Sequence, residues 1–244
     1  MTPLNAVPAT GNASRRGDEE LREIGLRAQE RLSGADARDV IAWAASEFGP
    51  RWAIASSMQD AVLPHLVASL APGVDVLFLA TGYHFDETLA TRDEVAARYA
   101  VRVRDVLPRQ SVAEQDAQYG AELFARDPDL CCFLRKDNPL AEALEPYEAW
   151  GTGLRRAEAS TRAAASEVSW DDAHGLVKVN PIVRWSDADV AAYSASHDVV
   201  RNPLLERGYP SIGCAPCTRA VAPGGDPRSG RWSGTGKTEC GIHR

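Results

Sequence analysis

The middle of the chain alternates between short apolar runs and longer amphipathic segments. The apolar runs at residues 52–55, 74–79 and 101–106 have the length of buried strands. Amphipathic stretches at 61–70 and 86–99 separate them, and this order predicts βαβ units with right-handed crossovers. We therefore expect an α/β fold, a parallel sheet flanked by helices, which binds its ligand at the carboxyl ends of the strands.

Further elements are predicted on both sides of this unit. Residues 18–32 and 36–48 have the pattern of two helices, and 111–148 is largely helical. Strands are expected at 148–151 and 175–179, followed by a helix at 186–197 that begins at a capping serine. The chain then divides into a disordered N-terminus (1–16), one α/β domain (17–221) and a mobile, Gly- and Pro-rich C-terminal tail (222–244).

Composition and charge narrow the function classes. The 244-residue chain has 25% charged residues and a formal net charge of −7. Such an acidic chain is a poor general nucleic-acid binder, because phosphate backbones select basic surfaces. No apolar run reaches membrane-spanning length, and the N-terminus lacks a signal-peptide pattern. We expect a cytoplasmic protein with no nucleic-acid or membrane partner, and the sequence leaves homo-oligomer formation open.

Four of the five cysteines form two close pairs. Cys214 and Cys217 have C-x-x-C spacing, whereas Cys131 and Cys132 are adjacent. Where thiols are kept reduced, such pairs bind metal or perform redox chemistry more often than they form structural disulfides. Zinc and an iron–sulfur cluster both suit two pairs. Adjacent cysteines diverge, which favours the larger cluster over a single ion, and unrelated buried thiols are the third interpretation.

Two loops and several cations are candidate anion-binding groups. The loop at 56–60 enters a helix, which suits a phosphate or sulfate, although Ser and Asp there are also ordinary helix caps. The Thr-Gly loop at 81–85 is either part of the same rim or a simple turn. Arg135 and Lys136 follow the first cysteine pair. An ordinary surface charge is a reasonable interpretation of Arg135, and for Lys136 a role at the site is an equal alternative. Guanidinium groups bind such oxygens bidentately, and candidates are Arg155, Arg156, Arg162, Arg228 and Arg231.

The fifth cysteine, Cys240, lies in the tail, next to Gly241 and close to His243. It is left over once four cysteines complete one site. An accessible thiolate there would be a nucleophile. The alternative is a tail thiol without a role.

Together these segments resemble the assimilatory adenylyl-sulfate reductases, the iron–sulfur branch of the family that also contains phosphoadenylyl-sulfate reductases. The matching stretches begin at residues 131 (Cys-Cys-Phe-Leu-Arg-Lys), 152 (Thr-Gly-Leu-Arg-Arg) and 208 (Gly-Tyr-Pro-Ser-Ile-Gly-Cys-Ala-Pro-Cys-Thr). Two more begin at 228 (Arg-Ser-Gly-Arg-Trp) and 237 (Lys-Thr-Glu-Cys-Gly-Ile-His). The cysteine motifs and the Glu-Cys-Gly-Ile-His tail are highly specific in combination.

The resemblance implies an adenine nucleotide alpha hydrolase-like fold and a 4Fe–4S cluster on Cys131, Cys132, Cys214 and Cys217. It implies reduction of adenylyl sulfate to sulfite and AMP by thioredoxin or a glutaredoxin-like reductant, in sulfate assimilation and cysteine biosynthesis. Cys240 would attack the sulfate sulfur and carry an S-sulfonate, and Lys136 would lie between cluster and sulfate. Substrate contacts would come from Ser56, Ser57, Thr81, Gly82, Gly153, Arg162, Arg228 and Arg231.

Two features depart from the family pattern, and other functions compete. Ala80 stands where an acidic residue commonly precedes Thr-Gly, and Ser-Ser-Met-Gln-Asp is a degenerate form of a Gly-rich nucleotide loop. The nearest alternative is a phosphoadenylyl-sulfate reductase or a dual-specificity enzyme, but members specialised for that substrate generally lack the cluster cysteines. An ATP-dependent tRNA-thiolating enzyme is disfavoured by the acidic charge and the tail motif. A zinc-stapled binding protein without catalysis is the remaining alternative.

Overall fold

A single mixed sheet organises the molecule. The computed structural model describes residues 15–235, 237, 239 and 241–243. Its strands lie in the order β3-β2-β1-β4-β6-β5, with bounds β1 Trp52–Ala55, β2 Asp75–Leu79, β3 Arg102–Val106, β4 Ala149–Thr152, β5 Val168–Asp171 and β6 Leu176–Val179. Every neighbouring pair is parallel except the β5–β6 pair at one edge. The predicted parallel sheet is confirmed, and the antiparallel strand β5 was not predicted.

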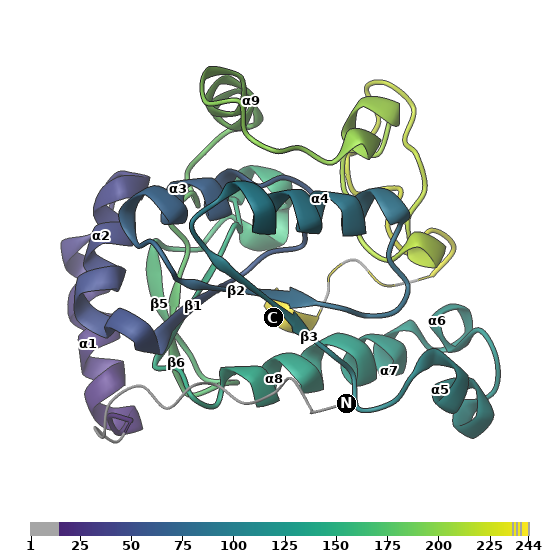
Figure 1. Cartoon of the computed structure of the whole chain (residues 1–244), viewed down its shortest axis with the longest axis horizontal. Helices are drawn as coiled ribbons and strands as arrows, with labels where there is room; N and C mark the ends of the chain where they lie inside the picture. Colours follow the sequence, from purple (N-terminus) through teal and green to yellow (C-terminus); the bar gives the residue numbers. More distant parts are fainter. Residues whose placement is uncertain (1–14, 236, 238, 240, 244) are drawn as a thin grey trace.

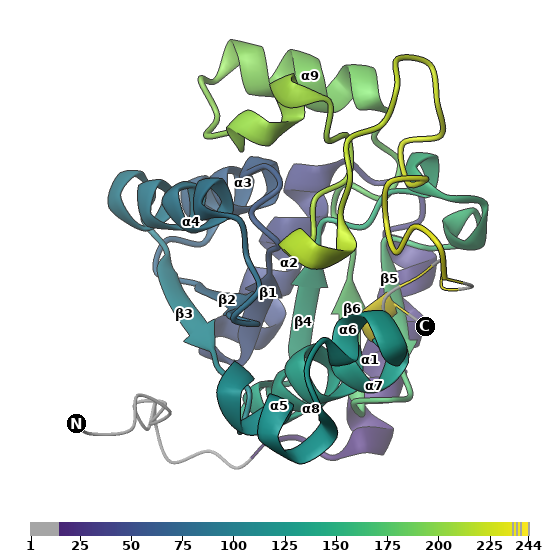
Figure 2. The ribbon, with the colours of Figure 1, turned by 90° about the vertical axis from the view of Figure 1, so that its right-hand side faces the viewer.

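Helices cover both faces of this sheet (Figures 1 and 2). On one face lie α1 (Asp18–Arg31), α2 (Ala37–Phe48), α3 (Val62–Leu70) and α4 (Asp86–Arg98). On the other face lies α8 (Asn138–Leu144), which continues from α5 (Val112–Tyr119), α6 (Leu123–Arg126), α7 (Pro128–Cys132) and the π-helical segment η2 (Phe133–Asp137). The helix α9 (Asp187–Ser196) lies beyond α3. All the helices expected between residues 18 and 197 are present.

The alternation of side chains along the strands divides the core into two parts. Trp52 and Ile54 of β1 point into the larger cluster, together with residues of α1, α2 and α3. Ala53, between them, points to the opposite face and packs with Leu140 and Leu144 of α8. This period of two is the geometry of a strand, and it explains why continuous apolar runs predicted strands buried on both faces.

Several boundaries differ from the predictions. Residues 1–14 of the predicted disordered segment lie outside the described residues. Arg15 and Arg16 are held, because Arg15 donates to the carbonyls of Tyr147 and Gly175 and Arg16 binds the Glu148 carboxylate. Within α1 the side chains that face the core are those of Leu21, Ile24 and Ala28, with Gly25 beside them. Leu26 is not part of this buried face, because it is 54% exposed. The domain division itself remains a prediction.

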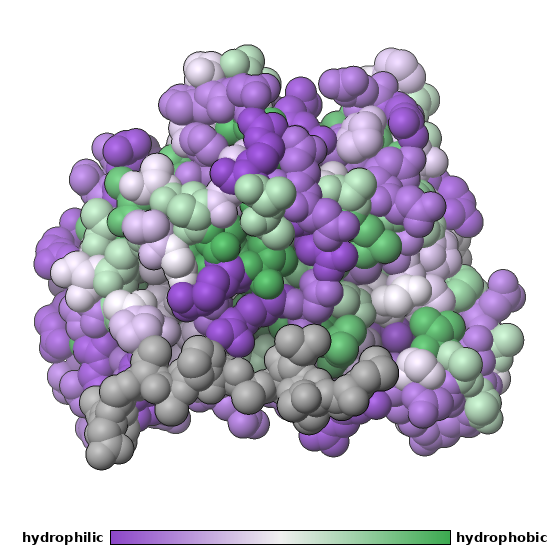
Figure 3. Space-filling model, in the orientation of Figure 1, coloured by the Kyte–Doolittle hydropathy of each residue, from purple (hydrophilic) through white to green (hydrophobic). Residues whose placement is uncertain are grey.

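Hydrophilic side chains cover most of the face drawn in Figure 3. The large apolar side chains exposed in the described chain are Leu26, Leu107 and Phe133. Over residues 15–235 and the described tail positions, no helix has both the length and the apolar character needed to cross a membrane.

Candidate active site

A cleft opens where the strand order reverses. β1 and β4 are neighbours, but β1 continues through its helix to β2 on one side, and β4 leads to β6 on the other. The loops at the carboxyl ends of such strands diverge and leave a crevice between them. Here the crevice has a volume of about 200 Å³. Among its lining residues are seven predicted substrate contacts, namely Ser56, Ser57, Thr81, Gly153, Arg162, Arg228 and Arg231.

The loop after β1 is fixed by one buried side chain. Met58 has a φ of 57°, a left-handed conformation that is uncommon without glycine, and its side chain is fully buried. Its backbone N–H donates to Ser56 Oγ at 3.3 Å. Asp60 Oδ1 accepts from the Val62 N–H at 3.0 Å, although the N-cap residue of α3 is Ala61, which has no side-chain cap. Ser56 and Ser57 still line the cleft.

The loop after β2 rests on a buried arginine. Arg135 is 3% exposed; its Nε donates to the Thr81 carbonyl and its Nη1 to Gln115 Oε1 at 3.1 Å. The interpretation of Arg135 as a surface charge was therefore wrong. Gly82 has a φ of 79°, and a Cβ there would lie 3.1 Å from the Arg135 guanidinium and 3.0 Å from Val112. Gly82 is absent from the described cleft lining, and its contact with the substrate stays a prediction.

The four paired cysteines come together although they lie in two distant segments. Cys131, Cys132, Cys214 and Cys217 line one small cavity with apolar walls that include Phe124 and Trp232. Burial raises the pKa of the Cys131 thiol to about 11, and the nearby Cys214 and Cys217 add to this effect. Burial also raises the pKa of Cys217. Within the described part of the chain, we find no group of three or more histidine, cysteine, aspartate or glutamate side chains that is arranged to hold a metal ion.

Lys136 connects the cysteine cavity to the cleft. It lines both spaces, as do Cys214 and Trp232. Thr81 reinforces the connection, because its hydroxyl lies 3.4 Å from Cys214 Sγ. The wall that the two spaces share is therefore made of a cation, a thiol and an aromatic ring.

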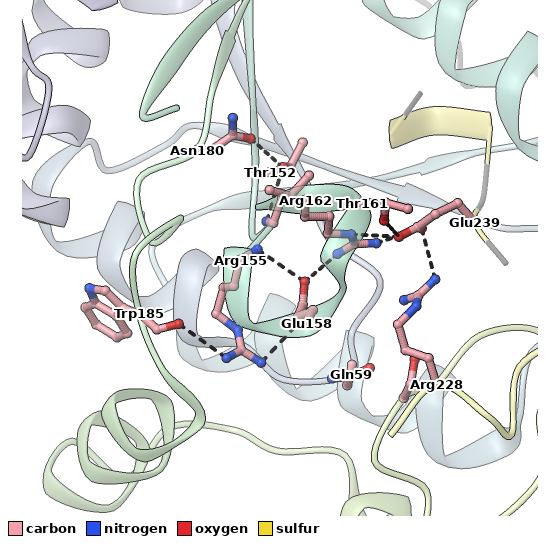
Figure 4. Close-up of polar contacts among 12 residues, drawn as sticks. Gln59, Thr152, Arg155, Glu158, Thr161, Arg162, Asn180, Trp185, Arg228 and Glu239 are labelled. Carbon is pink, nitrogen blue, oxygen red and sulfur yellow. Dashed lines mark hydrogen bonds and ion pairs between the residues drawn. The ribbon is translucent and has the colours of Figure 1, made fainter. Parts of the chain in front are cut away.

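Two of the predicted anion-binding arginines meet on one carboxylate (Figure 4). Glu239 binds Arg162 through both oxygens, at 3.0 Å to Nε and 3.0 Å to Nη2. Its Oε2 also accepts from Arg228 at 2.9 Å, and its Oε1 accepts from Thr161 Oγ1 at 3.2 Å. Burial opposes ionisation, but these hydrogen bonds and charges outweigh it and hold the pKa of Glu239 below its usual value. Glu158 binds Arg162 from the other side.

The other predicted contacts are braced by their neighbours. Arg231 Nη1 donates to Ser211 Oγ at 3.1 Å, and its guanidinium lies 4.5 Å from the centre of the Trp232 ring. Gly153 follows Thr152, whose hydroxyl donates to Asn180 Oδ1 at 2.9 Å. Both arrangements fix side chains at the rim without filling the cleft.

Cys240, the predicted nucleophile, lies outside the described residues. Glu239 before it is bound to the arginine pair, and the short helix η7 (Gly241–His243) after it contacts η2. Three acidic residues of this region were not among the predicted site residues. Asp60 and Glu158 line the cleft, and Glu239 was quoted only as part of the tail motif. Acidic residues at a site expected to bind an anion gave no sequence signal.

This fold and this cleft define an adenine nucleotide alpha hydrolase-like α/β protein. The chain belongs to the phosphoadenosine phosphosulfate reductase family, because the model of that domain matches residues 51–220. It is 55% identical over 228 residues to an adenosine 5'-phosphosulfate reductase of Streptomyces coelicolor, covering 93% of this chain and 97% of the relative. The same identity, over 226 residues and 96% of the relative, holds for the adenosine 5'-phosphosulfate reductase of Mycolicibacterium smegmatis.

A solved structure agrees with this assignment. The phosphoadenylyl-sulfate reductase of Candida auris, determined as a phosphate complex, superimposes with a TM-score of 0.69 at 26% identity. The match covers 86% of this chain and 100% of that one. The resemblance inferred from the motifs is therefore confirmed at the level of the family and the fold.

Proposed function

We propose that this protein reduces adenylyl sulfate to sulfite and AMP, with thioredoxin or a glutaredoxin-like protein as reductant, in assimilatory sulfate reduction. The observation that carries the proposal is the shared wall at Lys136, which joins a cleft lined by arginines to a cavity of four cysteines. The similarity to enzymes named adenosine 5'-phosphosulfate reductase supports the choice of substrate.

The reaction divides into two thiol steps. The Cys240 thiolate attacks the sulfate sulfur, an S–S bond forms, and AMP leaves with the electron pair of the broken sulfur–oxygen bond. A thioredoxin thiolate then attacks Cys240 Sγ, and sulfite leaves with the electron pair of the broken S–S bond. The second thioredoxin thiol resolves the mixed disulfide, so thioredoxin is oxidised by two electrons and Cys240 returns as a thiolate.

The residues around the cleft would bind and polarise the substrate. Arg162, Arg228 and Arg231 would hold the phosphosulfate oxygens, since guanidinium groups bind such oxygens bidentately. Lys136 would stabilise the negative charge that builds up on the transferring sulfate. The nucleotide would contact Ser56, Ser57, Thr81, Gly82 and Gly153.

Cys131, Cys132, Cys214 and Cys217 would hold a 4Fe–4S cluster. All four line one cavity, whose other lining residues are apolar or aromatic apart from Arg135 and Lys136. A cluster spreads its ligands more widely than a single ion does, which suits an adjacent pair. When bound, the cluster would supply a fixed charge distribution beside the sulfate, without carrying electrons in the cycle. Because the reaction consumes thiol reducing power, we place it in the cytoplasm.

Intact mass spectrometry tests the function directly. Protein purified without oxygen is mixed with adenylyl sulfate in the absence of thioredoxin. We expect a gain of one sulfonate group, mapped to Cys240 and removed by reduced thioredoxin. Cys240→Ser should bind substrate and gain nothing, whereas an adduct on another cysteine, or none on protein with intact iron, would refute the mechanism.

The main alternative is reduction of the 3′-phosphorylated substrate, phosphoadenylyl sulfate, after which the Candida auris enzyme is named. We expect a clear preference for adenylyl sulfate when the turnover of the two substrates is compared at equal concentration. Comparable rates would define a dual-specificity enzyme, and a preference for the phosphorylated substrate would overturn the choice.

A further inference from the structure

We infer that Glu239 is an internal competitor of the substrate anion: it occupies the Arg162–Arg228 pair when the cleft is empty, and the substrate must displace it. This inference rests on the proposed function, which assigns the same arginines to the phosphosulfate. It adds a role for the residue next to Cys240 and links the position of the tail to substrate binding.

The contacts of Glu239 have the form of an anion site. One carboxylate receives two parallel bonds from Arg162, one from Arg228 and one from Thr161, between 2.9 and 3.2 Å. The side chains are only 9% exposed for Arg162, 16% for Arg228 and 15% for Glu239. Two guanidinium groups and a hydroxyl around a pair of oxygens match the donors that bind sulfate or phosphate.

Arg162 cannot bind a second anion in the same way while Glu239 stays. The edge formed by Nε and Nη2 is occupied by Glu239, and Nη1 of the remaining edge is bound to Glu158. Glu158 also accepts from the Arg155 backbone N–H at 3.2 Å, and it lies in the same short loop as Arg162. Glu239 belongs instead to the C-terminal tail, so it is the partner that can leave.

Displacement has a measurable consequence. When a protein spends part of its time in a state that excludes a ligand, its apparent affinity equals the intrinsic affinity multiplied by the fraction of molecules that can bind. Removing the charge of Glu239 weakens the internal competitor and leaves the arginines in place. The substrate should then bind more tightly, in contrast to the usual result of removing a polar side chain from a site.

The test compares substrate affinity in proteins that cannot turn over. Calorimetry with adenylyl sulfate is performed on Cys240→Ser and on the same protein with Glu239→Gln. We expect Glu239→Gln to tighten binding by about three- to tenfold, because a charge-assisted contact is replaced by a weaker neutral one. Glu206→Gln removes the same charge from an exposed residue outside the described cleft lining, and it should leave the affinity unchanged.

A second measurement follows the tail itself. With no ligand present, trypsin should cleave after Lys237 faster in Glu239→Gln than in the parent, because the tail has lost its anchor. Unchanged or weaker substrate binding in Glu239→Gln would overturn the competition. If that happens while the sulfonate adduct still forms on the parent protein, which keeps Cys240, only this inference fails. Absence of substrate binding to Cys240→Ser together with absence of the adduct on the parent would overturn the proposed function.

Discussion

Individual arginines around the cleft differ in what they hold. Arg135 is buried under the Thr81 loop and donates to a backbone carbonyl and to Gln115, so its charge supports the scaffold. Arg162 and Arg228 meet at a carboxylate from the tail, so their partner can be exchanged for a ligand. Residue type alone does not separate these two uses. The neighbours decide, and they come from elements that are distant in sequence.

Lys136 is the residue where charge should matter most for rate. We expect Lys136→Ala to lower kcat/KM by about two orders of magnitude or more, since it removes a cation from the reacting sulfate in a sheltered site. Sulfite release and iron content per chain are measured together. The iron content should remain near that of the parent.

Arg219→Ala is the matched control for Lys136. Arg219 follows the second cysteine pair, but its hydrogen bonds go to the carbonyls of Ala215 and Thr218 and it is absent from the described cleft lining. Its loss should change the rate little. If Lys136→Ala loses iron in proportion to activity, Lys136 is a structural residue of the cysteine cavity.

At the scale of elements, periodic pattern was enough for most of the fold. The apolar run at β1 and the Asp36 cap of α2, which accepts from the N–H groups of Arg38 and Asp39, were predictable because both are local. β5 was missed, since its residues Val168–Asp171 pair only at a sheet edge with β6 and carry little apolar signal. The segment Phe133–Asp137 was predicted as helical but not as π-helical, because the type of helical turn depends on what packs around it.

One buried carboxylate connects β2 to β3 and to the segment between α8 and β4. Asp75 of β2 accepts from Arg102 at 2.8 Å and from the Tyr147 hydroxyl at 2.6 Å, and it is paired with Arg104. We expect Asp75→Asn to lower the free energy of unfolding by about 2–3 kcal/mol, because a buried ionic network loses its centre. Denaturant unfolding at neutral pH measures this change. Asp105→Asn breaks a more exposed pair with Arg92 and should cost about 1 kcal/mol or less.

The same carboxylate predicts a pH dependence. Burial alone would raise the pKa of Asp75, but hydrogen bonds from Arg102, Tyr147 and Arg104 outweigh it and hold the pKa below its usual value. A carboxyl with a lowered folded-state pKa stabilises the protein above its unfolded pKa of about 3.9 and loses this contribution as the pH falls further. The parent should therefore lose stability more steeply below about pH 4 than Asp75→Asn does. Parallel curves would exclude Asp75 as a source of acid sensitivity.

On the scale of the whole molecule, the site is an assembly of distant segments. The cleft combines residues from Ala55 to Ile242, and the cysteine cavity joins α7 to the loop at Cys214. The motifs indicated which residues belong to the chemistry. Which of them touch, and that Glu239 binds the arginine pair, depends on tertiary packing that spacing does not encode. The predicted mobility of the tail remains untested, but on both sides of Cys240 the described residues contact the domain.

The last contact of the tail depends on a glycine. A Cβ on Gly241 would lie 2.0 Å from Asp137 Oδ2 and 2.7 Å from its Cγ, and Ile242 next to it packs against the smaller core cluster. Gly241→Ala should force the tail away from η2 and lower turnover by about tenfold, because the nucleophile loses its position, while affinity for AMP stays the same. Gly17→Ala makes the same change in open space and should be neutral. Adding Asp137→Ala to Gly241→Ala should restore much of the rate, whereas a defect that persists without the Asp137 carboxylate would show that the clash is not its cause.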